Sequence, residues 1–233
     1  MTDIWAARGK SEELLERSLK VEAQLLTSLF ETIDRIVILL ECNPRELAAR
    51  VTALTLLKAK RLGLGIYSLA LDCLGHEAGA LFRVLQESWE FLSFLRQDPS
   101  RAARVIESGP PKAGQIAKQI DSQFKEMRDY LNAHASHLAL SYHSMAHLVD
   151  DETSTLRLTN RPSERVLRQN LAALFGVLLM SAGEALQVLP PDHADWEALA
   201  HELDDLRTRG YDQFRMDIGR SDSEGKQPPK PAP

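Results

Sequence analysis

The sequence of 233 residues lacks the features that mark several protein classes. It has only two cysteines, Cys42 and Cys73, and they do not form a CxxC pair. This spacing suggests neither a disulfide framework nor a thiolate metal site, so we expect both to be small core residues. No run approaches the roughly 20 uncharged apolar residues that cross a bilayer, and the N-terminus has no apolar stretch like that of a signal peptide. We therefore expect a cytoplasmic protein without membrane contact.

An excess of positive charge is also missing. The chain has 28 Lys and Arg residues against 33 Asp and Glu residues, a formal net charge of −5. This balance argues against a surface for indiscriminate phosphate binding, although a local basic cleft can still form because clefts depend on the arrangement of cations. The sequence has no GxGxxG, P-loop, HExxH or GxSxG motif. We therefore predict no cofactor.

What the sequence does have is helical periodicity. Apolar residues recur at intervals of three and four over most of the chain, which is typical of amphipathic helices. We predict an all-α bundle of long antiparallel helices in one domain, residues 1–218, with a short C-terminal helix and a disordered, proline-rich tail over 219–233. A short helix follows Asp98, and the other predicted helices span residues 11–41, 44–62, 66–94, 113–148, 162–189 and 195–214.

The segment most informative about function lies within the predicted helix 113–148. Arg128 is followed by the polar Asp129 and, after four more residues, by His134. This pattern resembles the motif of the HEPN superfamily (higher eukaryote and prokaryote nucleotide-binding), helical proteins whose active site is marked by an Arg, a polar residue and a His. The helix with Arg83 and Glu87 one turn apart is similar to the Arg and Glu helix of several uncharacterised HEPN-like bacterial families.

The resemblance implies a metal-independent endoribonuclease that works as a homodimer, with the Arg and His of two protomers meeting across a cleft. It also implies a toxin or phage-defence setting, with RNA and a protein inhibitor or regulator as partners. Cleaving RNA through its own 2′-hydroxyl needs a base near neutrality, which His134 could supply, and a fixed cation for the phosphate charge, which Arg128 could supply. Asp129 can orient either residue. Three further polar residues are candidates for binding the substrate: Arg83, Asn132 and His137.

Two alternatives remain open. The first is a non-catalytic helical interaction or regulatory module in which the motif is degenerate. The second is a metal-binding bundle, because His143 and His147 are four residues apart on one helical face and can share a metal ion. In that case Asp150 or Asp151 could supply an oxygen ligand.

Several charged residues also have purely structural interpretations. Arg83 and Glu87 are expected to form an i, i+4 ion pair on the helix surface. A cluster of cations at the end of the predicted second helix complements the helix dipole, and an RNA-binding role would need it beside His134. These cations are Lys58, Lys60 and Arg61.

Overall fold

Nine α-helices make up the part of the chain that the structure describes, which confirms the predicted all-α bundle. The computed structural model describes residues 5–42, 46–134, 148–149, 155, 161–189, 193 and 195–218, except for the side chains of residues 134 and 215–218. The helices are α1 (Ala6–Arg17), α2 (Lys20–Glu41), α3 (Leu47–Leu71), α4 (Ala78–Gln97), α5 (Arg101–Ser108), α6 (Ala113–Gln119), α7 (Lys125–His134), α9 (Glu164–Leu186) and α10 (Trp196–Ile218). The predicted tail, residues 219–233, lies outside the described residues.

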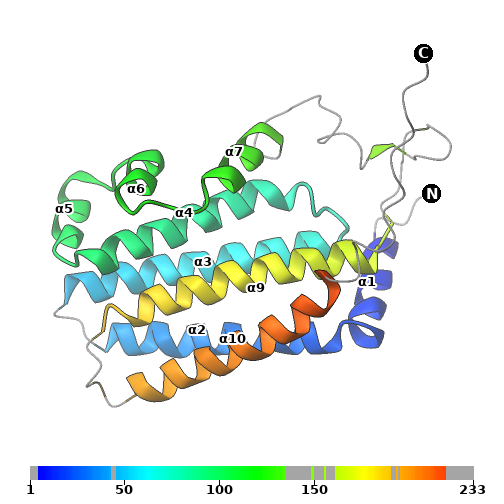
Figure 1. Ribbon diagram of the computed structural model, residues 1–233, viewed down its shortest axis with the longest axis horizontal. Coiled ribbons are helices and arrows are strands. Elements are labelled where there is room, and N and C mark those ends of the chain that lie inside the picture. The colour runs from blue at the N-terminus through cyan, green and yellow to red at the C-terminus, as the bar shows by residue number, and fades with distance from the viewer. Residues whose placement is uncertain are drawn as a thin grey trace.

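Five long helices, α2, α3, α4, α9 and α10, lie side by side and form the body of the molecule (Figure 1). Each turns its apolar face inward, as residues spaced three and four apart on a helix require. α9 packs against the other four long helices, so its apolar residues are covered on several sides. Most of the fully buried side chains that form the core come from α2, α3, α4 and α9, and they include Leu29, Ile33, Leu56, Leu85, Leu92, Leu174 and Leu178.

The close approach of α3 and α9 depends on a glycine. A Cβ atom on Gly63 would lie 3.0 Å from the side chain of Leu178, so the absence of a side chain lets the two helices pack tightly. By length and composition, α9 is the one helix in the described part of the chain that could cross a membrane. Its apolar residues are instead used to contact neighbouring helices of the bundle.

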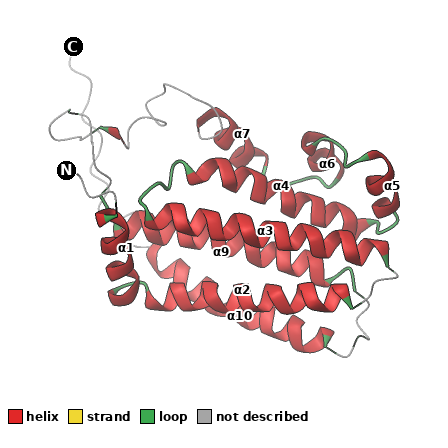
Figure 2. Cartoon of the chain, turned by 180° about the vertical axis from the view of Figure 1, so that it is seen from behind, coloured by secondary structure: helices red, strands yellow, loops and turns green. Residues whose placement is uncertain are grey.

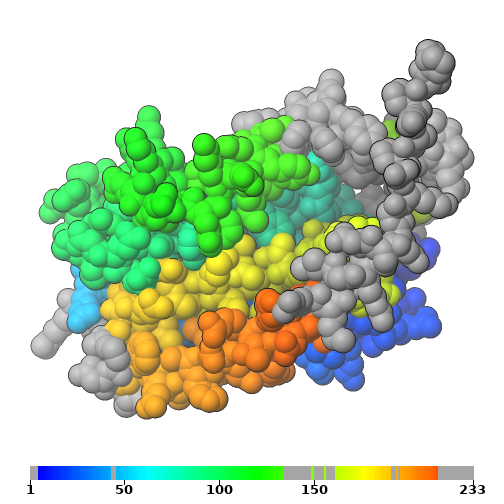
Figure 3. All heavy atoms as spheres, in the orientation of Figure 1, coloured from blue at the N-terminus to red at the C-terminus, as the bar shows by residue number. Residues whose placement is uncertain are grey.

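A second layer covers the outer side of α4. Helices α5, α6 and α7 follow α4 in the chain and lie on top of it in Figures 1 and 3. A small hydrophobic cluster, separate from the main core, attaches α5 and α6 to the end of α4 and consists of Phe94, Leu95, Ala102 and Ile116. α7 packs against α4 closer to its middle, and this contact determines the geometry of the predicted site.

Several predicted helix boundaries are wrong. The predicted helix 11–41 is divided at Ser18 and Leu19 into α1 and α2, whereas the break predicted near Gly63 is absent because α3 continues to Leu71. Residues 66–94 are not one helix either, since α4 begins only at Ala78. The last helix is also not short: α10 has 23 residues. Periodicity misses such boundaries because both helices at a turn bury their apolar faces in the same core.

The predicted helix 113–148 is interrupted as well, and the interruption orients the motif. α6 ends at Gln119, Asp121 has a left-handed φ of 51°, and α7 starts at Lys125. The hydroxyl of Ser122 accepts a hydrogen bond from the backbone N–H of Phe124 at 3.3 Å, a local turn contact that serine favours. The C-terminal part of this prediction, residues 135–147, lies outside the described residues.

The prediction that both cysteines belong to the core is wrong. Cys42 is exposed at the end of α2, and Cys73 is only half-buried. Cys73 lies in the turn between α3 and α4 with a φ of 60°, where the chain reverses direction. Both cysteines therefore lie at helix ends, whereas the residues that fill the core lie within the helices.

Candidate active site

The motif-bearing helix α7 is held on α4 by three apolar side chains. Phe124, Met127 and Leu131 are spaced three and four residues apart, and all three contribute to the main core. The ring of Phe124 meets that of Trp89 on α4 edge to face, with 4.9 Å between the ring centroids. Because Arg128 lies one turn after Phe124, this packing turns its side chain toward α4 as well.

The partner of Arg128 is Glu90, a residue that the sequence did not single out. The Nη2 group of Arg128 forms an ion pair with Oε1 of Glu90, whose side chain is only 1% exposed, against 16% for Arg128. The same oxygen accepts a hydrogen bond from the Ser122 hydroxyl at 2.6 Å. Gln86 Nε2 donates to the backbone carbonyl of Phe124 at 3.3 Å. The buried carboxylate of Glu90 thus connects the turn before α7, through Ser122, with α7 itself, through Arg128.

The interface retains unused hydrogen-bonding capacity. Buried polar atoms in proteins are nearly always paired, so a group of unpaired ones at one place is unusual. The carboxylate and amide oxygens among them can accept hydrogen bonds, whereas the guanidinium and indole nitrogens can donate. Among the described residues, five buried atoms here have no hydrogen-bond partner: Gln86 Oε1, Trp89 Nε1, Glu90 Oε2, Arg128 Nε and Asn132 Oδ1.

The predicted catalytic and substrate-binding residues of α7 occupy different positions. Asn132 lies one turn after Arg128 and is half-buried on the same face, but Asp129 is exposed. The described orienting partner of Arg128 is therefore Glu90 rather than its neighbour in sequence. His134 is the last residue of α7, and its side chain lies outside the described part of the chain. The predicted residue His137 also lies outside it.

The predicted ion pair on α4 is confirmed. Arg83 Nε and Glu87 Oε1 are 3.2 Å apart, with both side chains partly exposed. Arg83 precedes Glu90 by seven residues, which is two helical turns, so both lie on nearly the same side of α4. α7 runs in the opposite direction to α4 (Figure 1), so the path from Arg128 to the C-terminal end of α7 leads toward the Arg83 end of α4.

The metal site predicted from His143 and His147 cannot be located, because these residues and the two aspartates proposed with them lie outside the described residues. Within the residues that are described, no group of three or more His, Cys, Asp or Glu side chains is arranged to hold a metal ion.

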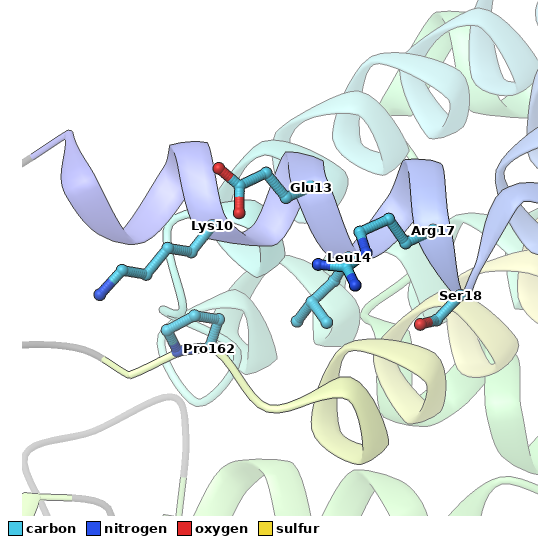
Figure 4. Close-up of a pocket in the computed structure, with 6 residues that line it drawn as sticks. All are labelled: Lys10, Glu13, Leu14, Arg17, Ser18 and Pro162. Carbon is cyan, nitrogen blue, oxygen red and sulfur yellow. The ribbon is translucent and has the colours of Figure 1, made fainter.

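A separate hollow lies between α1 and the segment before α9, at the end of the bundle where α1 is found (Figures 1 and 4). It has a volume of about 410 Å³, and its lining includes two cations, Lys10 and Arg17. In Figure 4, Lys10 extends toward Pro162, and the guanidinium of Arg17 folds back beside Leu14. Neither Arg128 nor Asp129 is among the described residues that line this hollow, so it is distinct from the described α4–α7 interface.

Sequence reasoning missed Glu90, Gln86 and Ser122. A signal was present for the first two, since Gln86 and Glu90 continue the four-residue spacing that begins at Phe82 and ends at Phe94, and so lie in line with apolar residues of α4. A charged residue at such a position is rarely buried unless it is paired. Its partner was not evident because Arg128 is 38 residues away and on another helix.

Comparison of the chain with models of known protein families, with curated proteins and with solved structures finds no match in any of the three.

Proposed function

We propose that the α4–α7 interface is the active site of a metal-independent endoribonuclease that acts as a cytoplasmic homodimer. The observation that supports this proposal is the ion pair between Arg128 and the buried Glu90. A cation that stabilises a transition state must be held in position before the reaction, and Glu90 fixes the guanidinium in this way. The described ion pair uses Nη2, and in the proposed reaction the two hydrogens on Nη1 of Arg128 bind phosphate oxygens.

The proposed reaction needs only groups of the protein and the RNA itself. His134 takes the proton of a ribose 2′-hydroxyl, and the 2′-oxygen then attacks the adjacent phosphorus. The bond from phosphorus to the 5′-oxygen breaks, and that oxygen leaves with a proton from solvent. The products are a 2′,3′-cyclic phosphate and a 5′-hydroxyl end. Arg128 stabilises the charge that develops on the non-bridging oxygens.

Cleavage of a mixed RNA pool in the presence of a chelator tests this proposal. We expect the wild-type protein to produce cyclic-phosphate ends, and we expect the variants Arg128→Ala and His134→Ala to lose at least 100-fold in rate, as general-base catalysis contributes about 10²–10⁴-fold. Product ends are identified by mass spectrometry. Absence of cleavage by the wild type, or equal cleavage by all three proteins, would contradict the nuclease assignment.

Two control variants separate catalysis from folding. Arg168 on α9 forms an ion pair with Glu22, which is also only 1% exposed, at 3.1 Å. Arg168→Ala therefore removes the same kind of buried ion pair from a different interface. His201 is an exposed histidine on α10, so His201→Ala is the control for His134→Ala. Both controls are expected to cleave RNA like the wild type wherever they are folded.

The same ion pair also supports a second candidate function, a non-catalytic interaction module. The charge of Arg128 is balanced by Glu90, and its side chain is largely covered, which suits a residue that only fixes α7 on α4. On this alternative, no RNA is cleaved, and Arg128→Ala and Arg168→Ala differ from the wild type only in stability. The cleavage experiment with its controls distinguishes the two functions.

A further inference from the structure

The charge of α3 differs from that of the whole chain. Its 25 residues include four cations, Arg50, Lys58, Lys60 and Arg61, but no aspartate or glutamate. The chain as a whole has a net charge of −5. A helix with charges of one sign in an acidic protein gives one surface a local potential opposite to that of the remainder.

Three of these cations share the outer face of the helix. Arg50, Lys58 and Arg61 are exposed, and their spacing of eight and three residues places them within one side of α3. Lys60 points elsewhere and pairs with Asp34 on α2 at 2.5 Å. None of the described carboxylates forms an ion pair with the three exposed cations. We call these three residues the α3 basic face.

The α3 basic face is accessible and adjoins a groove. Figure 2 shows α3 at the front of the molecule between α4 and α2, with α9 behind it. Lys58 lines a groove of about 320 Å³ between α3, α4 and the segment before α6. The carboxylate in this groove, Glu87, is already paired with Arg83. The groove therefore connects the α3 basic face with α4, which also carries the proposed active site.

We propose that the α3 basic face binds the phosphate backbone of single-stranded RNA. This inference rests on the proposed function, because it names the surface along which the substrate reaches α7. Arg50 and Arg61 are about 16 Å apart along the helix axis, so the three cations can contact successive phosphates of one strand. Free cations supply the electrostatic attraction that such binding requires.

The groove favours RNA over an anionic lipid surface. The exposed leucines Leu47, Leu54 and Leu64 also lie on the outer side of α3, and a basic and apolar helix face can bind lipid. A flat bilayer, however, cannot enter the groove that Lys58 lines, whereas a flexible single strand can. Lipid binding is therefore an alternative that the experiment must distinguish.

The experiment measures binding of a fluorescently labelled, single-stranded RNA whose 2′-hydroxyls are methylated, so that cleavage plays no part. The test protein carries Arg50→Gln, Lys58→Gln and Arg61→Gln, and a control triple variant carries neutralised Lys10, Arg17 and Lys20, which are also exposed. Both triple variants lower the net charge by three, from −5 to −8. They differ only in where the charge is removed.

We expect the α3 variant to bind the RNA at least tenfold more weakly than the wild type and the control variant. The slope of log Kd against log salt concentration should decrease by about 2, since each phosphate contact to a single strand contributes about 0.7. Circular dichroism confirms that the variants are folded. Equal binding by both triple variants would overturn the proposal.

Loss of binding to phosphatidylserine vesicles, with RNA binding unchanged, would also overturn it and assign the surface to lipid. Because the probe is not cleavable, this test can succeed where the cleavage assay fails, and the reverse is also true. The result of the binding test therefore does not decide the nuclease proposal, and the result of the cleavage test does not decide the binding proposal.

Discussion

At the scale of single residues, two buried glutamates each link a pair of neighbouring helices. Glu90 on α4 pairs with Arg128 on α7, and Glu22 on α2 pairs with Arg168 on α9. A buried carboxylate is costly unless a cation and hydrogen bonds compensate its charge. Each glutamate therefore requires its arginine, and the requirement links helices that are far apart in sequence.

Removing Arg128 should destabilise the fold as well as affect RNA cleavage. Arg128→Ala leaves Glu90 buried without its cation, and loss of one partner of a buried ion pair typically costs about 3–5 kcal/mol. We expect a decrease of that size in the free energy of unfolding at pH 7, measured by urea denaturation.

The double variant Arg128→Met with Glu90→Leu is the informative companion. It removes both charges and keeps the volume, so we expect stability close to that of the wild type. This variant also tests catalysis cleanly, because it is folded but lacks the guanidinium. If the double variant is as unstable as Arg128→Ala, the unpaired charge of Glu90 is not the cause of the stability that Arg128→Ala loses.

At the scale of helices, the contact between α9 and α10 depends on Gly210. A Cβ atom added there would lie 2.2 Å from a ring carbon of Phe175, which is only 3% exposed. The ring also packs against Phe214, with 5.5 Å between the centroids, so it has little room to move. The backbone of α10 thus approaches α9 as closely as a glycine permits.

Gly210→Ala should therefore destabilise the protein by about 1–3 kcal/mol, the usual cost of overpacking a core. The matched control is Gly183→Ala within α9, where an added Cβ meets no atom within 4 Å. There we expect a gain of up to about 1 kcal/mol, because alanine favours helix more than glycine does. Thermal unfolding shows whether each variant is more or less stable than the wild type. If Gly210→Ala left the stability unchanged, α9 and α10 would be able to move apart to make room for the added Cβ.

At the scale of the whole molecule, the long helices form one body, and the second layer leaves the α4–α7 interface near its surface. His134 is at the end of α7, and six residues on a straight helix separate it from Arg128 by roughly 9 Å along the axis. In a dimer with a shared cleft, the arginine of one protomer would lie near the histidine of the other.

Quaternary structure can be tested directly. We expect sedimentation equilibrium to give the mass of two chains, and we expect the RNA cleavage rate per chain to decrease once the protein is diluted below the dissociation constant of the dimer. A monomer that cleaves with a concentration-independent rate per chain would rule out a shared site.

The motif could be predicted from the sequence only as a pattern of residue types. Arg128, Asp129 and Asn132 were singled out together, but the fold separates them: Arg128 and Asn132 face inward, and Asp129 faces solvent. The reason is the turn before α7, which sets the rotation of the helix about its axis. That turn depends on Asp121 and Ser122, whose polar character fits a helix surface equally well.

The sequence by itself determined the all-α class, the approximate positions of the long helices but not all of their ends, and the Arg83–Glu87 pair, because helical periodicity and i, i+4 contacts are local properties. Only the tertiary structure decided which buried charge each arginine meets, which helix face remains exposed and where the chain turns. These depend on contacts between residues far apart in sequence, such as Glu90 with Arg128 and Gly210 with Phe175. Burial in a shared core selects such partners, and periodicity alone does not identify them.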